Sequence, residues 1–216
     1  MVAKNRCTLS AEATEKSGRT GYEEGLVVDC GSVGFSATCL CQDAPKKDAA
    51  PKAAVSPSQA LLDSWNDVGR KLIAMAEDFP EDKYDFKPTP AQRSFAEQLL
   101  HAANANYYFT NPATGKKMPA EEDPKRADYK TKAAVVAFVK KSFEDGAAAI
   151  KMKGDKGLSD VVVDPFANAQ VRLSEMAWGL LEHSGEHYGQ LAVYYRVAGL
   201  VPPESRPKNQ DDRLRN

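Results

Sequence analysis

The sequence predicts an all-α protein, a four-helix bundle with long connections. Four long segments repeat apolar residues at steps of three and four, the spacing of an amphipathic helix, and almost no segment alternates like a strand. The chain of 216 residues is 42% hydrophobic and 27% charged, which is ordinary for one soluble domain. We expect the bundle at residues 56–207, after a leader (1–55) and before a tail (208–216).

The charge balance argues against a nucleic-acid-binding protein. The chain has 29 Lys and Arg against 30 Asp and Glu, a net charge of -1, whereas nucleic-acid-binding domains usually carry a basic surface. No run of about 18 apolar residues occurs, so we expect no membrane span.

The leader lacks sustained periodicity and ends in an Ala/Pro/Lys-rich stretch at residues 43–55, a composition typical of a disordered linker. Residues 25–41 are mildly apolar but make a poor signal segment, because Asp29 and several glycines interrupt them. They could still be the remnant of an export segment. We favour the cytoplasm for this chain and keep export as the alternative.

All four cysteines lie in the leader, so the predicted bundle must be stable without disulfides. They are Cys7, Cys30, Cys39 and Cys41. The last two are separated by one residue, too close for the usual CxxC metal or redox unit. We therefore expect no cysteine site.

The first helix is predicted from Ser56 to Phe79. Pro57 suits the first helical position, and Pro80 ends the helix. Seven apolar residues repeat at steps of three and four in between: Leu61, Leu62, Trp65, Val68, Leu72, Met75 and Phe79. Residues 84–90 carry two prolines and are expected to form an extended loop.

The second helix is predicted to begin after Ser94, which forms a capping box with Glu97. Its apolar stripe consists of Phe95, Leu99, Ala102 and Ala105. His101 lies on the flank of this stripe. A connection rich in Pro and Gly follows at residues 111–130.

The third helix is predicted at residues 131–151 and is closed by Gly154 and Gly157. Residues 161–166 are apolar but too short for a helix, and we expect an extended crossover there. The last helix is predicted from Ser174 to Gly199.

The three histidines of the chain are the strongest functional signal. His183 and His187 are four residues apart, so their imidazoles share one helix face, about one turn apart. That face is also the apolar one, where two neutral imidazoles need a partner for their nitrogens. A divalent ion can be that partner, with His101 of the second helix as the third ligand. The alternative is that each ring is a hydrogen-bonded core histidine.

Two other metal motifs fit less well. His183, Glu186 and His187 match the inverzincin order, with Glu186 as the base of a protease. Such sites take a further acidic ligand well downstream, and beyond His187 the only glutamate is Glu204. A ferritin-like di-metal site needs Glu three residues before each His, where this chain has Leu180 and Ser184.

Four other residues of the last helix carry weaker expectations. Gly185 and Gly189 each cost about 1 kcal/mol relative to Ala, which suggests close approach of a neighbouring helix. Glu182 and Glu186 are expected to face outward or to orient an imidazole N–H.

With His101 on its second predicted helix and His183 and His187 on its last, the chain resembles the DinB-like (DinB/YfiT) superfamily of metal-binding four-helix bundles. The likeness covers about residues 56–207. It depends on residues 93–101 (RSFAEQLLH), 180–191 (LLEHSGEHYGQL) and 196–203 (RVAGLVPP).

The resemblance implies a fold, a metal site and a class of reaction. The metal triad of the superfamily falls on His101, His183 and His187, without substitution. The ion would be a divalent transition metal (zinc, nickel, iron or manganese). Activities in the superfamily include transfer and isomerisation reactions that use low-molecular-weight thiols such as bacillithiol or mycothiol, and relatives often form homodimers.

Three functions therefore remain open at this stage. The first is a thiol S-transferase with a small-molecule substrate, in which the ion lowers the pKa of the thiol. The second is a metal-dependent hydrolase with Glu186 as the base. The third is a non-catalytic metal-binding protein. Structural sites usually close with four protein ligands and only three are visible, which favours catalysis.

Overall fold

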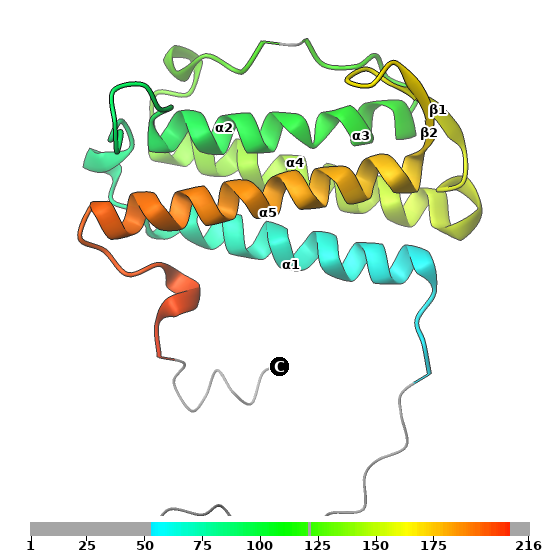
Figure 1. Ribbon diagram of the computed structural model, residues 1–216, viewed down its shortest axis with the longest axis horizontal. Coiled ribbons are helices and arrows are strands. Elements are labelled where there is room, and N and C mark those ends of the chain that lie inside the picture. The colour runs from blue at the N-terminus through cyan, green and yellow to red at the C-terminus, as the bar shows by residue number, and fades with distance from the viewer. Residues whose placement is uncertain (1–52, 121, 208–216) are drawn as a thin grey trace, which may run out of the picture. The chain divides into compact units, whose positions relative to one another are not determined.

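The computed structural model describes residues 53–120 and 122–207. The tail, nearly all of the predicted leader and the four cysteines lie outside the described residues. The described part is mostly helical, as predicted (Figure 1). Its helices are α1 (Pro57–Asp78), α2 (Phe95–Ala105), α3 (Tyr107–Ala113), α4 (Lys132–Gly157) and α5 (Leu173–Val197). Its strands are β1 (Val161–Asp164) and β2 (Ala169–Arg172), and single 3-10 turns lie at Glu81–Lys83, Arg126–Asp128 and Pro203–Ser205.

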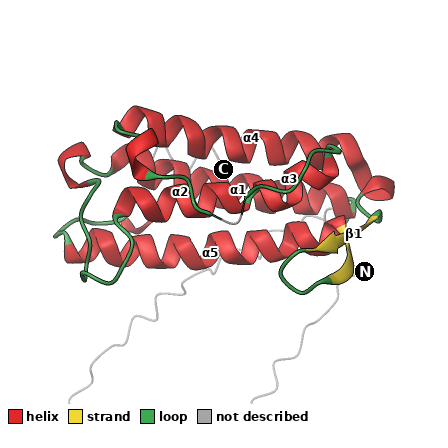
Figure 2. Cartoon of the chain, turned by 90° about the horizontal axis from the view of Figure 1, so that it is seen from above, coloured by secondary structure: helices red, strands yellow, loops and turns green. Residues whose placement is uncertain are grey.

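The bundle has four helical positions, and α2 and α3, which follow each other directly, together occupy one of them. α1 packs against α4 and α5, and α2 and α3 pack against the same two helices from the opposite side (Figures 1 and 2). α1 and α5 run in one direction, and the other helices run in the opposite direction (Figure 1). Because α3 and α4 run in the same direction, the chain must return along α2 and α3 before α4 begins. Residues 114–120 and 122–131 belong to this returning connection (Figures 1 and 2).

Local capping sets the starts of the first two predicted helices. The Ser56 side chain accepts a hydrogen bond from the Gln59 N–H at the start of α1. At the start of α2, Ser94 accepts from the Glu97 N–H, and the Glu97 carboxylate accepts from the Ser94 N–H at 2.6 Å. This reciprocal pair is the predicted capping box.

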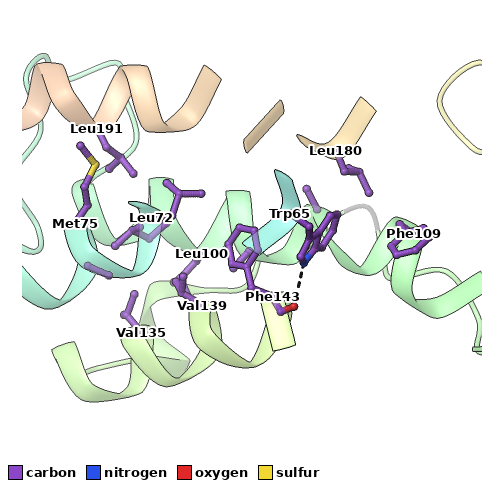
Figure 3. Packing of buried hydrophobic residues seen from close by; sticks show 14 of the residues in the cluster. Trp65, Leu72, Met75, Leu100, Phe109, Val135, Val139, Phe143, Leu180 and Leu191 are labelled. Carbon is purple, nitrogen blue, oxygen red and sulfur yellow. Dashed lines mark hydrogen bonds between the residues drawn. The ribbon is translucent and has the colours of Figure 1, made fainter. Parts of the chain in front are cut away.

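The core forms where α1, α2, α4 and α5 face one another (Figure 3). Trp65 is fully buried, and its indole N–H donates to the Phe143 carbonyl at 3.0 Å, which satisfies the one polar atom of its side chain (Figure 3). Gly146 allows this contact, because a Cβ there would overlap the Trp65 ring. Gly69 allows Phe143 to approach α1 in the same way.

Two helices extend beyond their expected ends. α3 is helical at residues 107–113, although Pro112 and the predicted connection from residue 111 argued against it. Tertiary burial explains the difference, because Thr110 and Ala113, on either side of Pro112, are buried in the bundle. α4 runs past residue 151 to Gly157, and Gly154, whose φ is 56°, kinks the helix.

The predicted crossover at residues 161–166 is extended only over Val161–Asp164, which form one strand of a β-hairpin, and residues 165 and 166 lie in its turn. β1 pairs antiparallel with β2, with Val161 opposite Arg172 and Asp164 opposite Ala169. Asn168 makes the turn with a positive φ of 49°. Sequence analysis did not identify β2, because the alternation of Ala169 and Val171 with polar residues is too short to be distinguished. The hairpin lies at one end of the bundle, beside the start of α5 (Figure 2).

Within the described ranges, none of the helices is both long enough and apolar enough to cross a bilayer.

Candidate metal centre

The structure brings all three histidines together in the interior of the bundle. One nitrogen from each of His101, His183 and His187 lies within 4.8 Å of the others. The Nε2 atom of His183 is 3.3 Å from that of His101 and 2.9 Å from that of His187. The ring centroids are 4.2 to 5.2 Å apart.

Two helices position these side chains. The i, i+4 spacing of His183 and His187 places both rings on the inner face of α5, where His187 is only 6% exposed. His101 comes from the neighbouring helix α2, where it lies between the buried Leu100 and Ala102 in the sequence. His101 and His183 are 82 positions apart in the sequence, and they meet because α2 packs against α5.

Asp123 holds the ring of His101 from outside the cluster. Its Oδ1 atom is 2.6 Å from His101 Nδ1, and its Oδ2 atom accepts from Arg93 at 2.9 Å. Sequence analysis missed Asp123, because it lies in the connection that returns along α2 and belongs to no pattern. Its carboxylate fixes the His101 proton on Nδ1 and leaves the Nε2 lone pair directed at the cluster.

His187 is held by two glutamines. Its Nδ1 atom lies 3.2 Å from Gln190 Oε1 and 2.5 Å from Gln98 Nε2, and the two amides also contact each other. When Nδ1 carries the proton, Gln190 accepts it and Nε2 is free to bind an ion. The Gln98 amide N–H donates to the same Gln190 oxygen and so holds it beside the ring. His183 differs, because its buried Nδ1 has no hydrogen-bond partner among the described residues.

The surroundings favour neutral imidazoles. Burial, followed by the proximity of His183 and His101, lowers the pKa of His187 to about 4. Burial and then His101 also lower the pKa of His183. Burial would raise the pKa of Asp123, but the hydrogen bonds from His101 and Arg93 outweigh it and leave that pKa below its usual range. A neutral imidazole is the form that binds metal.

The donor set fits a divalent transition ion. Two imidazole nitrogens that each lie about 2.0–2.1 Å from one ion are roughly 3 Å apart, close to the two Nε2 separations in the cluster. Nε2 lone pairs directed at one another repel unless a proton or a cation lies between them. The alternative expectation, that each ring is satisfied by protein oxygen, fails at His183. These three residues could hold one ion and leave other coordination positions for water or substrate.

A cavity of about 440 Å³ opens beside the cluster. His101 and His183 lie in its wall, whereas His187 does not line it. The hairpin contributes Asp164, Phe166 and Val171 to the wall. The rest of the lining comes from α2, α3, α5 and Asp123, and most of it is apolar. A small molecule could therefore reach the face of the cluster formed by His101 and His183.

One of the two weaker expectations for α5 is wrong, and the other agrees with the structure. A Cβ at Gly185 or Gly189 would meet nothing within 4 Å, and both residues are exposed, so the predicted close approach of a neighbouring helix is wrong within the described chain. Glu182 and Glu186 are exposed, which agrees with their expected outward orientation. The glycines that do permit close approach are Gly69 and Gly146.

A comparison with protein families decides the family. The model of the DinB superfamily matches residues 65–191, more than half of the chain. The chain belongs to the DinB superfamily. No curated protein matches the sequence.

Solved structures show the DinB superfamily fold in bacterial proteins. A DinB-like protein from Bacillus subtilis is 19% identical with a TM-score of 0.54, covering 69% of this chain and 99% of its own. A DinB-like protein from Bacillus cereus is 19% identical with a TM-score of 0.55, covering 67% and 95%. YfiT from B. subtilis is 12% identical with a TM-score of 0.57, covering 71% and 95%. YfiT is described as a probable metal-dependent hydrolase with an unusual four-helix bundle topology.

Proposed function

We propose that the protein is a mononuclear metal-dependent enzyme that activates a small thiol for transfer to an electrophile. His101, His183 and His187 are the proposed ligands of a divalent transition ion (zinc, nickel, iron or manganese). The observation that carries the proposal is the convergence of three Nε2 atoms on one point at the end of a largely apolar cavity.

Three neutral ligands support thiol activation. They leave the ion with its full positive charge, and an ion so held lowers the pKa of a thiol that joins it, so that the thiolate is available at neutral pH. The apolar wall excludes water from the thiolate, and Asp123 keeps His101 oriented. This reaction needs no separate base, which agrees with the exposed position of Glu186.

Hydrolysis is the second candidate, favoured by one observation. YfiT, which shares the fold, is described as a probable metal-dependent hydrolase. A bound ion could also supply hydroxide from water, but hydrolysis then needs a group to pass a proton to the leaving group, and Asp123 beside the cluster is already bonded to both His101 and Arg93. For this reason we rank thiol activation first.

The test begins with metal content. Protein purified without a metal-affinity column is expected to contain about one divalent ion per chain, and Ala at any of the three histidines should abolish binding while the helical content is retained. Metal-loaded protein is then incubated with small thiols and chlorinated or epoxide electrophiles, and conjugates are measured by mass spectrometry.

Glu186→Gln tests whether any hydrolysis uses Glu186 as its base, because ester turnover would then be lost in this variant. Thiol transfer should be unchanged in this variant, because Glu186 lies outside the cluster and the cavity. No metal in the wild-type protein would overturn the whole proposal. Bound metal without conjugates, together with turnover of a screened ester, would favour the hydrolase.

A further inference from the structure

The carboxylates that line the cavity beside the three histidines give its wall a negative charge. Its lining contains three carboxylates, Asp123, Asp164 and Glu175, and neither Lys nor Arg. The remaining wall is mainly apolar and includes Ala105, Tyr108, Phe166, Val171, Met176 and Leu180. Any positive charge that meets a ligand in this cavity must therefore come from the cluster itself.

The three carboxylates are not equivalent. Asp123 pairs with Arg93 at 2.9 Å, and Glu175 pairs with Arg172 at 3.0 Å. Asp164 has no ion-pair partner among the described residues; its Oδ1 atom accepts only the Phe166 N–H, at 2.8 Å. Asp164 is thus the uncompensated negative charge of the wall.

Basic side chains gather elsewhere. A second cavity, which shares only Asp123 with the first, is lined by Lys87, Arg93, Lys125 and Arg126. The bundle therefore separates an acidic and apolar cavity, which reaches the histidines, from a basic one, which does not.

The hairpin supplies the part of the wall that can distinguish ligands. Asp164 ends β1, Phe166 lies in the turn, and Val171 lies in β2. The Phe166 ring packs against Tyr108 of α3, with centroids 4.7 Å apart, which ties the turn to the bundle. A ligand whose head lies at His101 and His183 would direct its body toward these residues.

We infer that the cavity selects a thiol with an apolar body that ends in a neutral or cationic group, and that Asp164 discriminates against a thiol that ends in a carboxylate. The inference rests on the proposed thiol activation and names its substrate class. A terminal carboxylate would lose hydration in an apolar cavity and would face Asp164, whereas a terminal ammonium would be attracted by the same residue.

The test uses three alkanethiols that differ only at the far end: 1-hexanethiol, 6-amino-1-hexanethiol and 6-mercaptohexanoic acid. Each is titrated into the full chain loaded with cobalt(II), and the dissociation constant is read from the thiolate-to-cobalt absorption band, without turnover. We expect the aminothiol to bind at least about tenfold more tightly than the mercapto acid, with a smaller ratio at high salt.

Asp164→Asn is the decisive variant. Its side-chain oxygen can still accept the Phe166 N–H, so the turn is retained while the charge is removed. The ratio between aminothiol and mercapto acid should fall to about threefold or less. Asp82→Asn makes the same chemical change in the 3-10 turn after α1, outside the cavity, and should leave the ratio unchanged.

Equal affinities for the three thiols, tighter binding of the mercapto acid, or an unchanged ratio in Asp164→Asn would overturn the inference while leaving thiol activation intact. Failure of every thiol to alter the cobalt spectrum would overturn thiol activation, and the inference with it.

Discussion

At the residue scale, the cluster depends on groups that lie outside it. His101 is oriented by Asp123, and His187 by Gln190 and Gln98, through the ring nitrogen that faces away from the cluster. Such partners fix the tautomer and the ring orientation of a metal ligand. None of the three is revealed by spacing in the sequence.

Asp123→Ala should therefore weaken metal binding by about 10- to 100-fold, because the His101 ring loses its fixed tautomer and orientation. Competition with a chelator of known affinity measures the effect. Asp128→Ala, an exposed change in the same connection, serves as the control and should leave the affinity unchanged. Equal affinities for wild type and Asp123→Ala would mean that the carboxylate does not orient the ligand.

The lowered pKa of His187 makes the metal-free protein sensitive to acid. This pKa is about 4 in the folded chain and about 6.5 in the unfolded chain, so the unfolded chain binds more protons between these values. The free energy of unfolding should decrease as the pH falls from about 6.5 to about 4, by up to about 3 kcal/mol from this group. His183 acts in the same direction.

Urea unfolding of the metal-free protein across this pH range measures that loss. His187→Gln, which cannot titrate, should show a smaller slope between pH 6.5 and 4. A slope identical to that of the wild type would assign the acid sensitivity to other groups.

At the element scale, the helices follow local rules, while their packing depends on two glycines. Gly69 and Gly146 lie on facing helices, α1 and α4, where Phe143 and Trp65 fill the space a side chain would need. Gly185 and Gly189 are also glycines inside a helix, α5, but a Cβ at either would meet nothing within 4 Å. Only the structure separates these two kinds of glycine.

Gly146→Ala should destabilise the bundle by about 1–3 kcal/mol, because the new methyl group overlaps the buried Trp65 ring. Gly185→Ala should stabilise it by up to about 1 kcal/mol, since alanine favours a helix and nothing lies within 4 Å. Chemical denaturation of the two variants under one condition gives both values. Effects of the same sign would contradict the packing described for Gly146.

At the scale of the whole molecule, the cluster joins two neighbouring helices that are distant in sequence, because His101 belongs to α2 and the other two histidines to α5. A ligand that binds only the folded state stabilises that state by mass action. A metal ion held by both helices should therefore stabilise the packing of α2 against α5.

Metal at about 100 times its dissociation constant should add about 2.7 kcal/mol to the free energy of unfolding, which corresponds to a rise in Tm of roughly 5–10 °C. Scanning calorimetry with and without chelator measures the shift. In His101→Ala the added metal should leave Tm unchanged. A wild-type Tm that does not depend on metal would contradict a site that bridges α2 and α5.

The features predicted from sequence share a local cause. Hydrophobic periodicity identified four helices, Ser94 and Glu97 marked a helix start, and a four-residue step placed His183 and His187 on one face. Each depends on residues within about one turn of one another, whose relative positions the helix geometry determines.

The rest was decided by contacts between segments distant in sequence. The meeting of His101 with His183, the position of Asp123, the helical α3 despite Pro112 and the pairing of β1 with β2 all require the docked bundle. Burial and packing can override local propensity, and they depend on which segments meet. The amino-acid sequence thus determined the helices, the paired histidines and the choice of His101 as their partner, whereas only the tertiary structure decided how closely the three rings meet, which groups support them and which cavity lies beside them, because these depend on contacts between distant segments.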